Sequence, residues 1–522
     1  MKIDGIGSVG QSWARVLTIL GLVLAGCSAR PSTPAADQPS GADGTTAEAT
    51  RALVTIGDLR VTIDISRTAN LFHWIDNLAG TSAAKTREVY RHQWLERFGP
   101  LSQEDRLALK RFRDARLHRD PPRRGYPDGS GCLPPPRPRL PLRQRLSVAV
   151  MSARDPADLL ERAGRILPPR HVAALGAALD HFGPRFDTYW REVRHLEPFA
   201  ADLRRFLQRD NVQVFVARLI RFYEAEIDAD VPITISLIAL PEEGSTHAEA
   251  DGDHLLIEIR PRDRAKNQVQ VVFHELSHNL ARRVPADRQR ALEREFYSRG
   301  AFGSMAWSLL HEGLPTALGQ GVAQADLAPR GFRSDRSWYH RREIDAFARG
   351  IYDIVRRELA LGRTVSERLP RRVVRWLESS PLADLPLSEH LGETALAGSE
   401  ALLQGLANAE RSLIAKHAWR VRWDEPQGAR FLNGFECLPL VLLATQDELA
   451  RMPGELSALL PELADDRLPL APGLAGLVVP GARPSGSPVL LIVVASEIDA
   501  RRGVRAVRTT RGWPRRPFEV PR

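Results

Sequence analysis

Two histidines and a glutamate stand close together in the stretch VVFHELSHNLARRVP, residues 271–285. His274 and His278 are four residues apart, so on a helix they share one face and their ring nitrogens could bind one cation. Neutral imidazoles bind Zn²⁺ well, and a catalytic zinc site has three protein ligands and one open position. Glu275 would lie beside the metal and take a proton from a zinc-bound water, whose pKa zinc lowers to about 7.

The residues around the two histidines predict the helix that they need. Apolar side chains recur at spacings of three and four residues and give the helix a core face: Val269, Val272, Phe273, Leu276 and Leu280. Pro285 should stop this helix. The five-residue pattern also occurs without metal, as a helix with two surface histidines, so a third ligand is needed to strengthen the case.

Several downstream residues are candidates for the third ligand. Glu312 lies in the apolar segment WSLLHEGLPTALGQG, residues 307–321. Glu293 and Glu295 are alternatives, but their strongly charged amphipathic segment favours a solvated face. His311 is adjacent to Glu312 and would point elsewhere on a helix, where it could support the ligands from behind.

Pro315 is unusual in this apolar segment. Inside a helix, proline removes the hydrogen bond to the carbonyl of residue 311. We therefore expect the helix to begin or kink near Glu312.

An HExxH motif on one helix followed by Glu-Gly on a later helix resembles the gluzincin zinc metallopeptidases. In that family the two histidines and the later glutamate bind zinc, and the first glutamate is the general base. The resemblance covers roughly residues 231–361 and implies His274, His278 and Glu312 as zinc ligands and Glu275 as the base. The metzincin family requires a third histidine soon after the helix, and this chain has no histidine there.

The resemblance implies further features of the site. Gluzincins carry an edge strand beside the active-site helix on which extended substrates pair, and the segment His254–Arg260 would be this strand. A tyrosine or histidine from further along the chain normally stabilises the transition state, and Tyr339 and His340 are the candidates. Asp345, in the same segment, could orient a zinc-binding histidine. The alternative for Tyr339 and His340 is that they cap or pack the following helix.

The elements that position these residues predict an α+β fold that is predominantly helical. Residues 52–66 alternate apolar and polar side chains around Gly-Asp and predict a hairpin or two short strands, and helical periodicity follows as far as Ile227. The segments Pro232–Leu240 and His254–Arg260 predict a small sheet beside the active-site helix. Apolar runs beyond residue 380 predict a small separate α/β unit.

The N-terminus predicts export and anchoring. An apolar run of about eleven residues, Val16–Gly26, is too short to span a bilayer but fits a secretory signal. The residues Leu24 to Cys27 resemble the bacterial lipobox, which implies that Cys27 is lipidated and becomes the first mature residue. The alternative is an uncleaved apolar terminus with an incidental cysteine. By the sorting pattern of such lipoproteins, Ser28 favours the outer membrane if the host is Gram-negative.

Composition argues against a nucleic-acid partner. The formal charge is +9, but 64 acidic residues are interspersed with the 73 basic ones, and no long single-sign run marks a binding groove. Without Cys27, two cysteines remain, Cys132 and Cys437. An exported protein could join them in a disulfide, but the sequence leaves their pairing open.

We therefore expect a lipid-anchored extracytoplasmic zinc peptidase that acts on peptides or proteins. One alternative is a non-catalytic envelope lipoprotein that uses a metallopeptidase-like domain as a binding scaffold, and another is an enzyme that hydrolyses a non-peptide amide. The expected regions are a signal peptide (1–26), a flexible tether (27–50), a mainly helical region (51–230) with a Pro-rich loop (118–145), the metallopeptidase core (231–380), a C-terminal α/β unit (381–500) and a basic tail (501–522).

Overall fold

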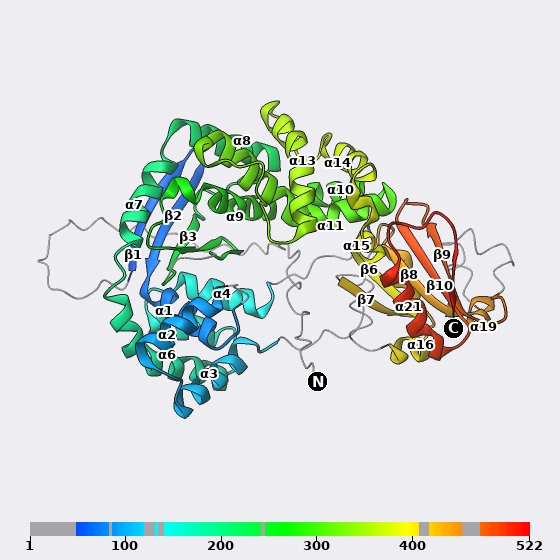
Figure 1. The fold of residues 1–522 in the computed structure, drawn as a ribbon, viewed down its shortest axis with the longest axis horizontal. Helices are drawn as coiled ribbons and strands as arrows, with labels where there is room; N and C mark the ends of the chain where they lie inside the picture. Colours follow the sequence, from blue (N-terminus) through cyan, green and yellow to red (C-terminus); the bar gives the residue numbers. More distant parts are fainter. Residues whose placement is uncertain are drawn as a thin grey trace, which may run out of the picture.

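A computed structural model describes the chain over residues 49–82, 86–119, 131–133, 140–241, 246–406, 417–451 and 470–521. The chain has an α+β fold in which helices predominate and the strands form two mixed sheets (Figure 1). The expected signal peptide, Cys27 and nearly all of the tether lie outside the described residues, as does most of the loop at 118–145. Within the described part, no helix is both long and apolar enough to cross a membrane.

The first sheet contains β1 (Ala49–Ile56), β2 (Leu59–Ser66), β3 (Ile233–Ala239), β4 (Ala248–Asp251) and β5 (His254–Ile259). Its strand order is β1-β2-β3-β5-β4. The three inner strands are parallel, whereas the edge strands β1 and β4 run antiparallel to their neighbours. The predicted hairpin is confirmed: β1 and β2 pair along their whole length and turn at Gly57, whose positive φ of 58° favours glycine.

Parallel pairing joins two parts of the chain that the sequence analysis divides at residue 230. β2 and β3 lie side by side, with Val61 opposite Ile233. A single hydrophobic core extends from Val54 to Leu382. Residues 51–230 and 231–380 therefore form one structural unit. The sequence did not predict this, because local periodicity does not reveal which distant strands pair.

The helices between β2 and β3 are α1 (Arg67–Leu78), α2 (Arg87–Phe98), α3 (Gln103–Arg116), α4 (Leu142–Ser152), α5 (Pro156–Gly164), α6 (Pro169–Trp190), α7 (Leu196–Leu207) and α8 (Asp210–Tyr223). Helices α1 and α4 cover the sheet face that carries His254 and Glu258. His73 Nε2 of α1 lies 2.8 Å from Glu258 Oε1, and Ser152 Oγ of α4 lies 2.9 Å from His254 Nε2. These contacts fix the N-terminal helices on β5.

The remainder of this unit is helical and consists of α9 (Val269–Arg282), α10 (Ala286–Tyr297), α11 (Gly300–Thr316), the π-helical stretch η2 (Ala317–Ala323), α12 (Gln324–Leu327), α13 (Arg342–Ala360) and α14 (Leu369–Glu378). In Figure 1, α9 lies between the sheet and α11. Asn279 Nδ2 of α9 donates to Gly252 O at 2.9 Å, and Arg282 Nη2 donates to Ala250 O at 2.6 Å. The helix with the two histidines is thereby fixed to the end of β4.

The C-terminal unit contains the second sheet, formed by β6 (Glu393–Gly398), β7 (His417–Arg422), β8 (Leu440–Thr445), β9 (Leu474–Ala482), β10 (Pro488–Val494) and β11 (Phe518–Pro521). The order is β11-β9-β10-β8-β6-β7, with β9 and β11 antiparallel to their neighbours and the other four strands parallel. Its helices are α15 (Leu387–Leu391), α16 (Glu400–Gly405), α18 (Pro426–Gly434), α19 (Gln446–Ala450) and α21 (Ala500–Thr509).

The expected basic tail at 501–522 is not a separate segment. Val504 and Val507 of α21 are fully buried in the core of the C-terminal unit. β11 pairs with β9, with Phe518 opposite Val478. The arginines of this region made it look polar along the sequence, but the apolar residues between them pack on the sheet.

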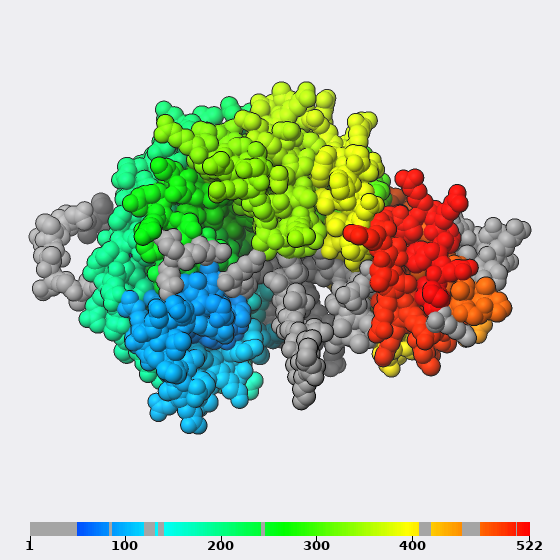
Figure 2. Space-filling view, viewed as in Figure 1, coloured from blue at the N-terminus to red at the C-terminus, as the bar shows by residue number. Residues whose placement is uncertain are grey.

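A disulfide between Cys132 and Cys437 settles the pairing that the sequence left open. It is flanked by backbone hydrogen bonds, including one from Gly131 N to Gly434 O at 2.8 Å. The contact connects the part of the chain between α3 and α4 to the C-terminal unit. Figure 2 shows the described part as an arch, with α1–α3 (blue) at one end, the C-terminal unit (red) at the other and α10–α14 between them.

Candidate metal centre

Helix α9 carries both histidines on one side and packs its apolar side into the core. The predicted helix is confirmed, and it ends at Arg282 before Pro285. Each residue of the predicted core face is at most 4% exposed, and this set comprises Val269, Val272, Phe273, Leu276 and Leu280. His274 Nε2 and His278 Nε2 lie 3.2 Å apart, which their spacing of about one helical turn allows.

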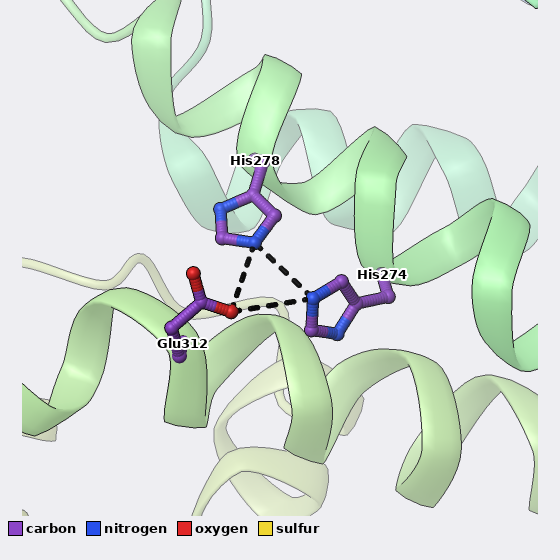
Figure 3. A group of neighbouring side chains, drawn as sticks. All are labelled: His274, His278 and Glu312. Atoms are coloured by element: carbon purple, nitrogen blue, oxygen red, sulfur yellow. Dashed lines mark hydrogen bonds and ion pairs between the residues drawn. The ribbon is translucent and has the colours of Figure 1, made fainter. Parts of the chain in front are cut away.

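Glu312 reaches the two histidines from α11, the neighbouring helix (Figure 3). Its Oε2 atom lies 3.6 Å from His274 Nε2 and 3.5 Å from His278 Nε2. The three ligand atoms lie within 4.8 Å of one another, and among the described residues these side chains form the cluster of histidine and acidic groups that could hold a metal ion.

The size of this triangle suits zinc. Its sides are 3.2, 3.5 and 3.6 Å. A point equidistant from its corners is about 2.0 Å from each, and zinc binds histidine nitrogen and carboxylate oxygen at about 2.0–2.2 Å. Two nitrogens and one oxygen also match the donor set of a catalytic site, which leaves one position for water or substrate. The residues present therefore fit a zinc ion.

The electrostatics of the cluster show strong mutual attraction. Burial by itself lowers the pKa of His274, but the carboxylates of Glu312 and Glu275 outweigh burial and raise that pKa overall. Burial would raise the pKa of Glu312, but His278 and His274 hold it well below its ordinary value. The two histidines thus hold Glu312 in its ionised form.

Glu275, the expected general base, is buried beside the cluster and is 6% exposed. Its charge contributes to the raised pKa of His274 and also to that of Tyr339. Glu275 directly follows His274 in α9.

Tyr339 is the expected transition-state residue that the fold brings to the cluster. Its hydroxyl donates a hydrogen bond to Glu312 Oε2 at 3.0 Å, and its ring stacks on that of His274 at 6.1 Å between centroids. Burial raises the pKa of the Tyr339 phenol, and the charge of Glu312 raises it further, so the phenol keeps its proton. His340 is exposed and stacks on the ring of Tyr339 at 4.4 Å.

Asp345, which was considered as a residue that orients a zinc-binding histidine, contacts backbone groups instead. Its Oδ1 atom accepts hydrogen bonds from the backbone N–H groups of Trp338 and Tyr339, the latter at 3.0 Å. Asp345 therefore holds the chain that carries Tyr339 and is not seen to orient a histidine. The sequence could not show this, because the acceptor and donors are six and seven residues apart across an irregular segment.

The competing candidates for a third ligand lie elsewhere. Glu293 was expected on a solvated face, but it is only 8% exposed, and burial raises its pKa to about 8. The amphipathic pattern did not predict this burial, because it depends on tertiary contacts of α10, whose main neighbours are α11 and α14. Glu295 is half-exposed and forms an ion pair with Arg299. The ring of His311 meets that of His278 edge-on at 5.8 Å between centroids.

Two residues beside His274 were missed by the sequence analysis. A Cβ atom at Gly319 would lie 2.4 Å from Gln270 O and 2.8 Å from His274 N, so only glycine lets η2 approach α9 this closely. Gln320, the next residue, lies beside His274 and helps to raise its pKa. The run LGQG was the available signal, but small residues alone do not say which helix they contact.

We expected the helix to begin or kink near Glu312; α11 begins at Gly300, so the expected start is wrong. Pro315 lies within α11, and the irregularity follows it as the π-helical stretch η2. π-Helical turns often occur at functional sites. Here η2 is the segment that places Gly319 and Gln320 against His274.

The edge strand beside α9 is β4, not the segment His254–Arg260. That segment forms β5, which lies between β3 and β4 and has both edges paired. β4 has one free edge among the described strands and is joined to α9 by Arg282. The sequence could not reveal this because β4, with the sequence AEAD, is too short and polar to predict a strand.

Comparison with protein-family models, with curated proteins and with solved structures gives no match for this chain. Function therefore has to be inferred from the residues of the site, since a fold alone does not specify an activity.

Proposed function

We propose that this protein is an extracytoplasmic zinc-dependent peptidase with a gluzincin-like core. The observation that carries the proposal is the convergence of His274, His278 and Glu312 into a triangle of zinc-binding size. Tyr339 donates a hydrogen bond to the Glu312 corner of this triangle, and Glu275 directly follows His274 in α9. A mixed sheet with an antiparallel edge strand beside the metal-binding helix agrees with the proposed core.

A zinc ion held by these ligands would lower the pKa of a bound water and polarise a substrate carbonyl. Glu275 accepts the proton of the attacking water and passes it to the leaving amine, which is the usual work of a buried carboxylate base. Tyr339 keeps its proton and donates a hydrogen bond to the carbonyl oxygen as negative charge develops there. His340, the other expected donor, is more exposed and stacks behind Tyr339.

A peptide or protein substrate suits the free edge of β4. Main-chain groups of an extended peptide can pair with such an edge, and side-chain contacts then give selectivity. The proposed lipid anchor at Cys27 would place the enzyme in the cell envelope, at the outer membrane if the host is Gram-negative. Hydrolysis of a non-peptide amide would use the same residues, and a panel of peptide and amide substrates separates the two reactions.

The test is zinc content by mass spectrometry together with peptide hydrolysis, measured on the full chain after reconstitution with zinc. We expect about one zinc per chain in the wild type, much less in Glu312→Ala, and full zinc without hydrolysis in Glu275→Gln. Glu293→Gln is the matched control, because Glu293 was a rival ligand and lies outside the triangle; it should keep both zinc and activity.

A folded, reconstituted protein without zinc would refute the proposal. Full zinc with no hydrolysis of any peptide in the panel would instead favour the non-catalytic scaffold.

A further inference from the structure

The segment Phe332–Arg341, here called the tyrosine segment, presents Tyr339 to the metal centre. It has no regular secondary structure and precedes α13. Arg349 Nη2 of α13 donates to Ser334 O at 3.0 Å, and Trp338 Nε1 donates to Arg333 O at 3.1 Å. The segment thus depends on side chains for its conformation, since no ladder of backbone hydrogen bonds supports it.

Among the side chains of α13 that contact the tyrosine segment, Asp345 is the one that binds the backbone of Tyr339 itself. One carboxylate oxygen, Oδ1, accepts from two consecutive N–H groups, those of Trp338 and Tyr339. The other oxygen, Oδ2, faces Arg349 Nη1 at 3.7 Å. The Asp345 side chain is only 15% exposed and sits in the first turn of α13. A rigid helix therefore holds the backbone of Tyr339 at a fixed place.

The side chain of Tyr339 is restrained separately, by the hydrogen bond to Glu312 and by stacking on His274. These contacts fix the ring only if the backbone stays in place. If the backbone moved away from α13, the hydroxyl would leave Glu312, because both restraints act at short range. The position of the hydroxyl thus depends on Asp345.

We propose that Asp345 is a positioning residue that clamps the backbone of Tyr339 and so holds the Tyr339 hydroxyl at the metal centre. Its effect on catalysis rests on the proposed peptidase function, but its effect on the tyrosine segment does not. Asparagine at position 345 keeps the Oδ1 acceptor, whereas alanine removes it. The pair of substitutions therefore separates the clamp from the charge.

The experiment compares Asp345→Ala, Asp345→Asn and the control Asp353→Ala, in which an exposed aspartate of the same helix is removed. The first readout is the rate of tryptic cleavage after Arg333 and Arg336, which are exposed arginines of the tyrosine segment. Loss of hydrogen bonds to a charged acceptor should raise the open population, and hence the cleavage rate, at least roughly tenfold in Asp345→Ala. Asp345→Asn should stay close to the wild type, and Asp353→Ala should equal it.

The second readout is steady-state peptide hydrolysis of the zinc-loaded protein. Asp345→Ala should lower kcat at least roughly tenfold with little change in KM, because the hydroxyl acts in the transition state. Zinc content should not change, since all three ligands remain. Asp345→Asn should restore most of kcat, a rescue that a general loss of stability would not give.

Tryptic cleavage of Asp345→Ala at the wild-type rate would overturn the clamp, as would Asp345→Asn behaving like Asp345→Ala. If the wild type binds no zinc and hydrolyses nothing, the peptidase proposal fails. The cleavage rates still decide the clamp in that case, because they require neither metal nor substrate.

Discussion

Glu293 offers a test of how the unit that contains α9 and α10 meets the C-terminal unit. Burial and, to a smaller extent, the charge of Glu393, the first residue of β6, together raise the pKa of this carboxyl to about 8. Tyr297, one turn along α10, is 1% exposed and is also affected by both carboxylates. A protonated Glu293 is therefore favoured in the folded protein.

The sign and size of the effect follow from linkage. In the unfolded chain the pKa of Glu293 returns to its ordinary value of 4.5, so between pH 4.5 and about 8 the folded state holds a proton that the unfolded state has lost. The free energy of unfolding must then fall as pH rises through this window. The difference is about 3.5 pH units, which at 1.36 kcal/mol each amounts to at most about 5 kcal/mol.

Glu293→Gln removes this dependence, because glutamine has the shape of the protonated acid and never ionises. We expect urea unfolding to give similar stability for variant and wild type near pH 5, and a variant more stable by a few kcal/mol at pH 8.5. The control is Asp287→Asn, which removes an exposed negative charge from the same helix and should change stability by less than about 1 kcal/mol. Parallel loss of stability in Glu293→Gln and wild type would refute the buried, protonated state.

Two further predictions concern packing and location. Gly319→Ala should destabilise the fold by roughly 1–3 kcal/mol and weaken zinc binding, because the new Cβ would meet the backbone at Gln270 and His274. Urea unfolding measures the change in stability, and zinc titration measures the change in zinc affinity. The control is Gly164→Ala, because a Cβ atom at Gly164 would meet open space. An unchanged zinc affinity in Gly319→Ala would contradict the prediction. Cys27→Ser should move the protein from the membrane fraction to the soluble fraction on cell fractionation; continued membrane association would remove the proposed lipid anchor.

Local sequence patterns were sufficient for several elements. The recurrence of Val269, Val272, Phe273, Leu276 and Leu280 predicted α9 and its buried face, and the four-residue spacing placed His274 and His278 together. The alternating residues around Gly57 predicted the β1–β2 hairpin. These features depend on neighbours within a few residues, and backbone geometry then fixes where the side chains point.

Local sequence patterns gave wrong predictions for residues that are buried by parts of the chain far away in the sequence. Glu293 looked solvated because its own segment is charged, but tertiary contacts bury it, and the charge of Glu393 in the C-terminal unit adds to the rise in its pKa. Residues 501–522 were expected to form a basic tail, but in the structure α21 and β11 pack on the second sheet. In both cases the deciding contacts come from residues far away in the sequence.

The sequence by itself determined which side chains could carry zinc chemistry, and it placed two of them on one helical face. Only the tertiary structure decided that Glu312 meets them, that Tyr339 reaches Glu312 and that Asp345 holds Tyr339. Helical periodicity is a local property of the backbone, whereas the meeting of α9, α11 and the tyrosine segment depends on packing between elements. Packing is fixed by the shapes of all contacting surfaces together, and no single segment contains that information.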